Sequence, residues 1–95
     1  MPEYKILAHR RVIKFLKSLQ DERLKARLKE ALAELQNYPI ALRRLDVEKL
    51  EGLKRAYRVR VREYRIIFLV NKEDKTIYIT HIGGRESIYE NLTRC

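Results

Sequence analysis

The spacing of apolar residues changes its period twice along this chain. Residues 4–8 (YKILA) form a short apolar run that predicts an opening strand. From His9 onward the period becomes helical, and one stripe has the i, i+3, i+4, i+7 spacing of a helix face: Val12, Phe15, Leu16 and Leu19. The chain therefore predicts a strand followed directly by an amphipathic helix.

A second helical stripe begins after a break at residues 18–21. Asp21 is of the residue type that caps helix N-termini, and the run 37–39 (NYP) ends the pattern. Between these limits apolar residues again share one face: Leu24, Leu28, Ala31, Leu32 and Leu35. Two helices with so short a connection predict an antiparallel hairpin.

Beyond Pro39 the pattern is typical of strands, and it predicts three of them. Residues 55–62 alternate with a period of two, residues 64–70 are almost continuously apolar, and residues 76–82 form the third strand after a turn at 71–75. Gly83 and Gly84 end the third strand, and residues 85–92 form either a short closing helix or an extended tail. Sequential strands of this kind pair most simply as an antiparallel meander.

The predicted fold class is α+β. An N-terminal strand and an antiparallel helix hairpin precede three sequential strands, and the hairpin packs on one face of a mainly antiparallel sheet. Residues 1–95 form a single domain, since the chain has no linker, repeat or low-complexity stretch. The other sheet face stays partly open. Its candidate lining is the side of strand 55–62 that carries Arg58, Arg60 and Arg62, while Tyr57, Val59 and Val61 face the opposite way.

Composition narrows the choice of partners. The 95 residues carry a formal net charge of +9, which favours a polyanionic partner, either nucleic acid or an acidic protein. A thermophilic surface rich in charged residues is the alternative, although such a surface tends to balance its signs. The single cysteine, Cys95, excludes an internal disulfide framework, and no cluster of ligands predicts a metal site or a cofactor. No apolar run is long enough for a membrane span and the opening residues lack a signal-peptide layout, so we expect a cytoplasmic protein.

The strongest chemical signal is a cluster of cations. Residues 54–65 contain six basic residues and one acid, interleaved with tyrosines. Arginines two apart on a strand lie about 6–7 Å from one another, a spacing that matches successive phosphates of a nucleic-acid backbone. A solvated outer strand face is the alternative, and we expect it to be disfavoured because neighbouring acids that would pair with these arginines are missing from the cluster. His81 is either a half-buried strand histidine with a satisfied ring or an acid–base group.

Four segments together resemble the RelE/ParE superfamily of toxins, and within it the RelE branch. They are residues 49–53 (KLEGL), 57–62 (YRVRVR), 64–68 (YRIIF) and 82–89 (IGGRESIY). The order and spacing of these segments carry the resemblance, which extends over essentially the whole chain. It implies a RelE-like, microbial-ribonuclease-like fold.

The resemblance also implies an activity. RelE-type toxins are metal-independent endoribonucleases that cut messenger RNA in the ribosomal A site, where a ribose 2′-hydroxyl attacks the adjacent phosphate. It implies a RelB-like acidic antitoxin as partner in a hetero-oligomeric complex, besides the ribosome with its small-subunit RNA and the message. ParE-like inhibition of DNA gyrase, or an inactive relative that only anchors an antitoxin as a co-repressor, remain the alternative functions.

Carried over residue by residue, the resemblance assigns catalytic roles to three positions. Arg65 and Arg85 match the phosphate-stabilising arginines of the family, and Tyr89 matches the tyrosine that orients the substrate or takes part in proton transfer. RelE-type toxins often carry lysine at the positions of Arg58 and Arg60. Because arginine stays protonated, neither residue can be the general base. These two, with Arg62 and Lys54, are instead expected to bind RNA phosphates, and His81 is a candidate acid or base.

Overall fold

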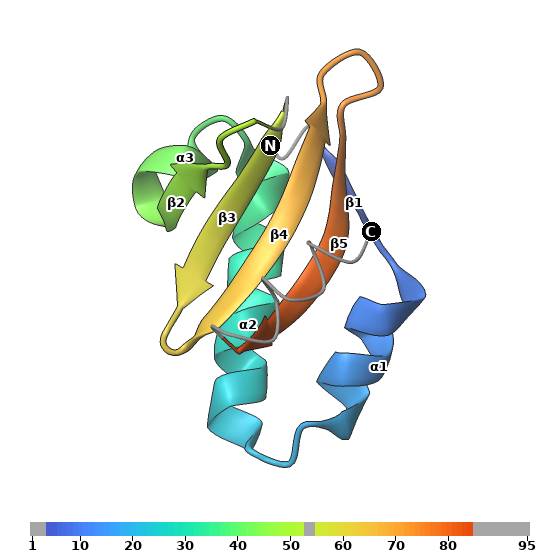
Figure 1. The fold of residues 1–95 in the computed structure, drawn as a ribbon, viewed down its shortest axis with the longest axis vertical. Helices are drawn as coiled ribbons and strands as arrows, with labels where there is room; N and C mark the ends of the chain where they lie inside the picture. The colour runs from blue at the N-terminus through green and yellow to red at the C-terminus, as the bar shows by residue number, and fades with distance from the viewer. Residues whose placement is uncertain (1–3, 53–54, 85–95) are drawn as a thin grey trace.

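The computed structural model describes residues 4–52 and 55–84 of the chain. Figure 1 shows one curved sheet with the helices gathered behind it and along one edge. The elements follow in chain order as β1 (Lys5–Ala8), α1 (Arg10–Ser18), α2 (Glu22–Glu34), a 3₁₀ turn η1 (Leu35–Asn37), α3 (Ala41–Arg44), β2 (Asp46–Lys49), β3 (Ala56–Val61), β4 (Tyr64–Asn71) and β5 (Thr76–Gly84).

The sheet has five strands in the order β1-β5-β4-β3-β2. Strands β3, β4 and β5 pair antiparallel in sequence, which confirms the predicted meander. β1 pairs parallel with β5, so the opening strand returns to the sheet at the edge beside the last described strand. The α+β class and the mainly antiparallel sheet are therefore confirmed.

The helix hairpin is also confirmed, and its N-cap is visible. The Asp21 carboxylate accepts hydrogen bonds from the backbone N–H groups of Arg23 (3.0 Å) and Leu24 (3.2 Å), which satisfies two of the donors left open at the start of α2. Figure 1 shows α2 lying behind β3 and β4. The core forms between these layers from fully or almost fully buried side chains, among them Val12, Leu28, Ala31, Leu35, Val59, Ile66, Phe68, Ile77 and Ile79.

The structure corrects the interpretation of the segment between Pro39 and Arg55. The sequence predicts no separate elements there, yet α3 and β2 occupy it, each only four residues long. Elements this short complete barely one turn or two strand repeats, so their periodicity is too weak to detect. β2 forms because Val47 adds to the core while its backbone pairs antiparallel with β3.

A β-bulge in β5 changes the direction of His81. Ile67 of β4 pairs with His81, whereas Phe68 pairs with Ile79, so Thr80 is an extra residue in the ladder. Simple alternation places His81 on the same face as Ile77 and Ile79, and this is wrong. The bulge shifts the register by one, and His81 shares the sheet face of Ile67, opposite α2.

Candidate phosphate-binding face

The side of the sheet opposite α2 carries three arginines on neighbouring strands, and we call it the arginine face. Arg58 and Arg60 lie on β3, and Arg65 of β4 pairs directly with Arg60. Because adjacent strands are about 4.8 Å apart and alternate residues about 7 Å, the three side chains leave the backbone from one small patch. The expectation that Arg58 and Arg60 share a face is thus met, and pairing across the sheet adds Arg65.

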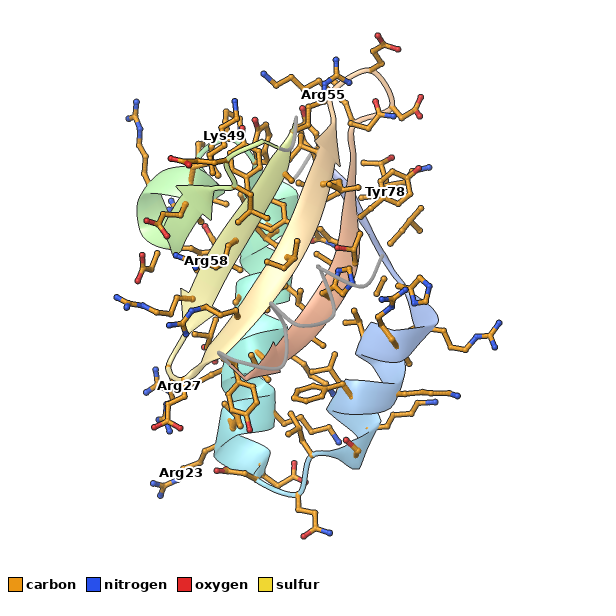
Figure 2. All side chains as sticks on the ribbon, in the orientation of Figure 1. Arg23, Arg27, Lys49, Arg55, Arg58 and Tyr78 are labelled. Atoms are coloured by element: carbon orange, nitrogen blue, oxygen red, sulfur yellow. The ribbon has the colours of Figure 1, made fainter. Side chains whose placement is uncertain are left out.

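The cross-strand register arranges this face in rows. One row runs from Asp46 through Arg60 and Arg65 to Gly83, and the next runs from Glu48 through Arg58 and Ile67 to His81. A third row, Ala56, Leu69, Tyr78 and Leu7, is apolar or aromatic. Figure 2 shows Arg58 on the β2–β3 side of the sheet and Tyr78 on the β5 side. The face therefore changes from charged to apolar along the strands.

The expectation that the arginines lack acidic neighbours is wrong. β2 supplies an acid opposite each arginine of β3: the Asp46 carboxylate accepts a hydrogen bond from Nε of Arg60 at 2.7 Å, and Glu48 forms an ion pair with Arg58. The acids lie 10 and 14 residues before their partners along the chain, so a search confined to the basic cluster misses them. Only the pairing of β2 with β3 brings them together.

Arg62 does not continue the row of Arg58 and Arg60. β3 ends at Val61, and Arg62 lies in the turn before β4 with a φ of 57°. Its side chain contributes instead to a groove of about 490 Å³ at the sheet edge, together with Arg27 of α2 and Arg44 of α3. Strict alternation through residue 62 fails because the hairpin turn begins one residue earlier. Three other predicted site residues, Lys54, Arg85 and Tyr89, lie outside the described residues.

The guanidinium of Arg65 is held by the adjoining turn. Its Nη1 donates to the backbone carbonyl of Tyr64 at 3.2 Å, with a longer contact of 3.5 Å to the carbonyl of Arg62. Tyr64 in turn packs its ring edge-on against Phe15 of α1, with the centroids 5.7 Å apart. A cation fixed by backbone carbonyls on a paired central strand keeps its orientation, as an anion-binding group requires.

His81 takes part in a directed chain of hydrogen bonds. Arginine can only donate, so Nη1 of Arg11 donates to Nε2 of His81 at 2.9 Å. Nδ1 of the neutral ring then carries the proton and donates to the Thr80 hydroxyl at 3.0 Å, and that hydroxyl donates to the Ile67 carbonyl at 3.3 Å. Burial, and then electrostatic interaction with Arg11 and with His9, lowers the pKa of His81.

This network favours a positioning role for His81 over acid–base chemistry. Both ring nitrogens have partners within the protein, and the residue is only 8 % exposed. Arg11, at the start of α1, was not among the residues that the sequence singles out. It lies 70 residues from His81 along the chain, and no local spacing relates the two.

Within residues 4–52 and 55–84, no three His, Cys, Asp or Glu side chains gather as metal ligands would. No helix in the described part of the chain is long and apolar enough to cross a membrane. The guanidinium groups of the arginine face are hydrogen-bond donors of the kind that bind phosphate groups.

The chain is also similar to known toxins. Residues 6–89 match the family model described as the ParE toxin of the type II toxin–antitoxin system parDE. A protein of Methanocaldococcus jannaschii named as toxin RelE1 is 35 % identical over 89 residues, covering 94 % of this chain and 98 % of the relative.

Solved structures of RelE proteins are also similar. RelE in the RelE–RelB complex from Pyrococcus horikoshii is 35 % identical with a TM-score of 0.76, and the match covers 90 % of this chain and 98 % of that one. The RelB–RelE complex from Methanococcus jannaschii gives 32 % identity and a TM-score of 0.73, covering 90 % and 96 %. The family model spans most of the sequence and relatives above 30 % identity cover nearly all of it, so the chain belongs to the RelE/ParE family of toxins of type II toxin–antitoxin systems.

Proposed function

We propose that this toxin is a ribosome-dependent, metal-independent endoribonuclease that cleaves messenger RNA in the A site and so inhibits translation. The observation that carries the proposal is the convergence of Arg58, Arg60 and Arg65 on one face of the sheet, in a chain similar to RelE proteins. Guanidinium groups on adjacent strands can contact neighbouring phosphate oxygens of one RNA strand. The work of such an enzyme takes place in the cytoplasm, where translating ribosomes are found.

The proposed reaction needs three tasks. The ribose 2′-hydroxyl loses its proton and attacks the adjacent phosphorus, the charge growing on the phosphoryl oxygens is neutralised, and the departing 5′-oxygen gains a proton. The products are a 2′,3′-cyclic phosphate and a 5′-hydroxyl. Arg65 serves the second task here, since its guanidinium is already oriented, and Arg85 and Tyr89 are proposed to join it.

Acid–base chemistry is the task that the described residues serve least. Arg58 and Arg60 stay protonated, and Nε2 of His81 is already occupied by Arg11. A site with so little proton-transfer capacity depends on positioning of the substrate, which can supply much of the barrier reduction. This supports dependence on the ribosome, because a programmed ribosome holds the message in a fixed conformation.

A cleavage assay tests the proposal. Purified toxin that has been dialysed against a metal chelator is incubated with ribosomes programmed with a defined message, and the termini of the products are mapped. We expect cleavage in the A-site codon with a 5′-hydroxyl on the downstream fragment, and much slower cleavage of the same message without ribosomes. Equal rates on both substrates would refute ribosome dependence, and no cleavage on either would refute the ribonuclease function and leave gyrase inhibition and the inactive co-repressor as the alternatives.

Inhibition of DNA gyrase is the second candidate, because the matching family model is described as the ParE toxin. The two functions differ in the process that stops first. Induced expression should arrest protein synthesis for a ribonuclease, while DNA synthesis continues. Loss of supercoiling by purified gyrase on addition of the toxin, with translation intact, would decide for the gyrase function.

We further propose that an acidic, RelB-like antitoxin binds the toxin in a hetero-oligomer. The formal net charge of +9 complements an acidic chain. Complex formation can be tested by co-elution of the toxin with the product of the neighbouring reading frame at moderate salt. Separate elution of the two proteins would remove this part of the proposal.

A further inference from the structure

We infer that Asp46 and Glu48 of β2 restrain the phosphate affinity of the arginine face, because they hold Arg60 and Arg58 in ion pairs that a phosphate must displace. The inference rests on the proposed function, in which this face binds the RNA backbone. It assigns a regulatory role to β2, an edge strand of four residues. The carboxylates then act as internal competitors of the RNA phosphates.

The geometry places one carboxylate against each guanidinium. Asp46 pairs in register with Arg60, and Glu48 pairs with Arg58, so both acids project on the same face as their partners. Among the residues that the structure describes, these four side chains line a pocket of about 210 Å³, and their formal charges sum to zero. An RNA phosphate that enters it meets arginines whose charge is already offset.

The exposure of the pairs makes exchange easy. The side chains of Glu48 and Asp46 are 65 % and 56 % exposed, that of Arg60 is 58 % exposed and that of Arg58 is 24 % exposed. Ion pairs whose carboxylates are this accessible contribute little to stability, and breaking one changes an equilibrium by only about two- to five-fold. A phosphodiester carries the same charge as a carboxylate and accepts hydrogen bonds from the same guanidinium fork, so it can replace the acid.

The alternative role for the two acids is to orient the arginines for RNA binding. The strand arrangement instead favours a role in which the acids lower the affinity of the arginines for phosphate. Arg58 and Arg60 belong to β3, whose backbone is fixed on its other side by six residue pairs with β4, from Ala56 with Leu69 to Val61 with Tyr64. Their positions on the face therefore do not depend on the exposed carboxylates of the edge strand. The two roles predict effects of opposite sign on RNA affinity.

The test combines Asp46→Asn with Glu48→Gln, which removes both charges and keeps the shapes of the side chains. The probe is a fluorescent 12-nucleotide single-stranded RNA, and its dissociation constant is measured by anisotropy at several salt concentrations. We expect binding to tighten about four- to 25-fold at low salt, from the two- to five-fold per pair. The slope of log K against log salt should steepen by about 0.7 for each added phosphate contact.

A matched control separates local release from the change in net charge. Glu22→Gln with Glu73→Gln also removes two negative charges and so raises the net charge by two. These exposed residues lie at the start of α2 and in the β4–β5 turn. If RNA binding tightens equally in the two double variants, the inference is overturned. Weaker RNA binding by the Asp46/Glu48 variant would show that the acids orient the arginines.

A further pair of variants distinguishes failure of the inference from failure of the proposed function. Arg58→Ala with Arg60→Ala should weaken RNA binding if the arginine face contacts phosphates. If this variant binds as tightly as the wild type, the proposed phosphate-binding face is wrong. If it binds more weakly while the Asp46/Glu48 variant is unchanged, the proposed face stands and only the restraint by β2 is refuted.

Discussion

Replacing Arg65 with alanine should separate the chemical step from substrate binding. The side chain lies on central strand β4 next to Arg60, and its Nη1 is held at 3.2 Å from the Tyr64 carbonyl. In the proposed function, a donor oriented in this way acts mainly on the charge that develops in the transition state. Loss of one such donor in other enzymes slows the reaction by about 10²–10³-fold, equivalent to about 2.7–4 kcal/mol.

The same variant should bind ribosomes almost normally. Arg58 and Arg60 remain on the face, and each phosphate contact adds only a modest share of the affinity. The loss of the hydrogen bond to the Tyr64 carbonyl costs about 1 kcal/mol, which lowers the Tm of a domain of this size by about 4–8 °C. Folding should therefore survive at assay temperature, and thermal unfolding checks this point.

Single-turnover cleavage of ribosome-bound message is the decisive assay. Arg65→Lys should be intermediate, because it keeps the charge and loses the planar fork. Arg23→Ala is the matched control, since Arg23 is an exposed residue of α2, on the side of the sheet opposite the arginine face. Cleavage by the Arg65→Ala variant at the wild-type rate, with saturating toxin, would refute the assignment of Arg65 to transition-state stabilisation.

Three other outcomes can be measured. The pKa of His81 lies below its ordinary value of 6.5 in the folded protein. The stability that the neutral ring contributes is therefore fully present above pH 6.5 and is lost as the pH falls through 6.5 towards the folded pKa. Chemical denaturation across this range should show a smaller decline in the free energy of unfolding for His81→Gln, whose amide can still accept a hydrogen bond from Arg11. The His9→Asn variant should show the same decline as the wild type. Asp21→Ala removes the cap of α2 and should cost about 1 kcal/mol in urea unfolding. Tyr89→Phe keeps a stacking ring without the hydroxyl, so a wild-type cleavage rate would exclude proton transfer by Tyr89.

The long periodic segments of this chain specify their own structure. The stripes containing Val12 and Leu28 predict α1 and α2, Asp21 marks the boundary between them, and three runs of strand pattern predict the meander. The prediction succeeds because each of these elements buries one face, and burial imposes a period on its residues. The alternation of Arg58 and Arg60 likewise predicts that they share one face of a strand, which β3 confirms, while phosphate binding by that face stays a prediction.

Contacts between distant segments were decided only by the tertiary structure. α3 and β2 are too short to show a period, and the bulge at Thr80, which turns His81 to the arginine face, leaves no signal in the alternation. The acids of β2 meet the arginines of β3 only because the two strands pair in the sheet, and Arg11 meets His81 only because of where α1 begins.

The reason is physical. Local sequence fixes which residues repeat on one face of an element, whereas register and edge pairing depend on the whole sheet. The sequence by itself therefore determined the α+β layers and the arginine strand. The fold decided which charges meet: Arg65 beside Arg60, Asp46 and Glu48 against the arginines of β3, and His81 bound to Arg11.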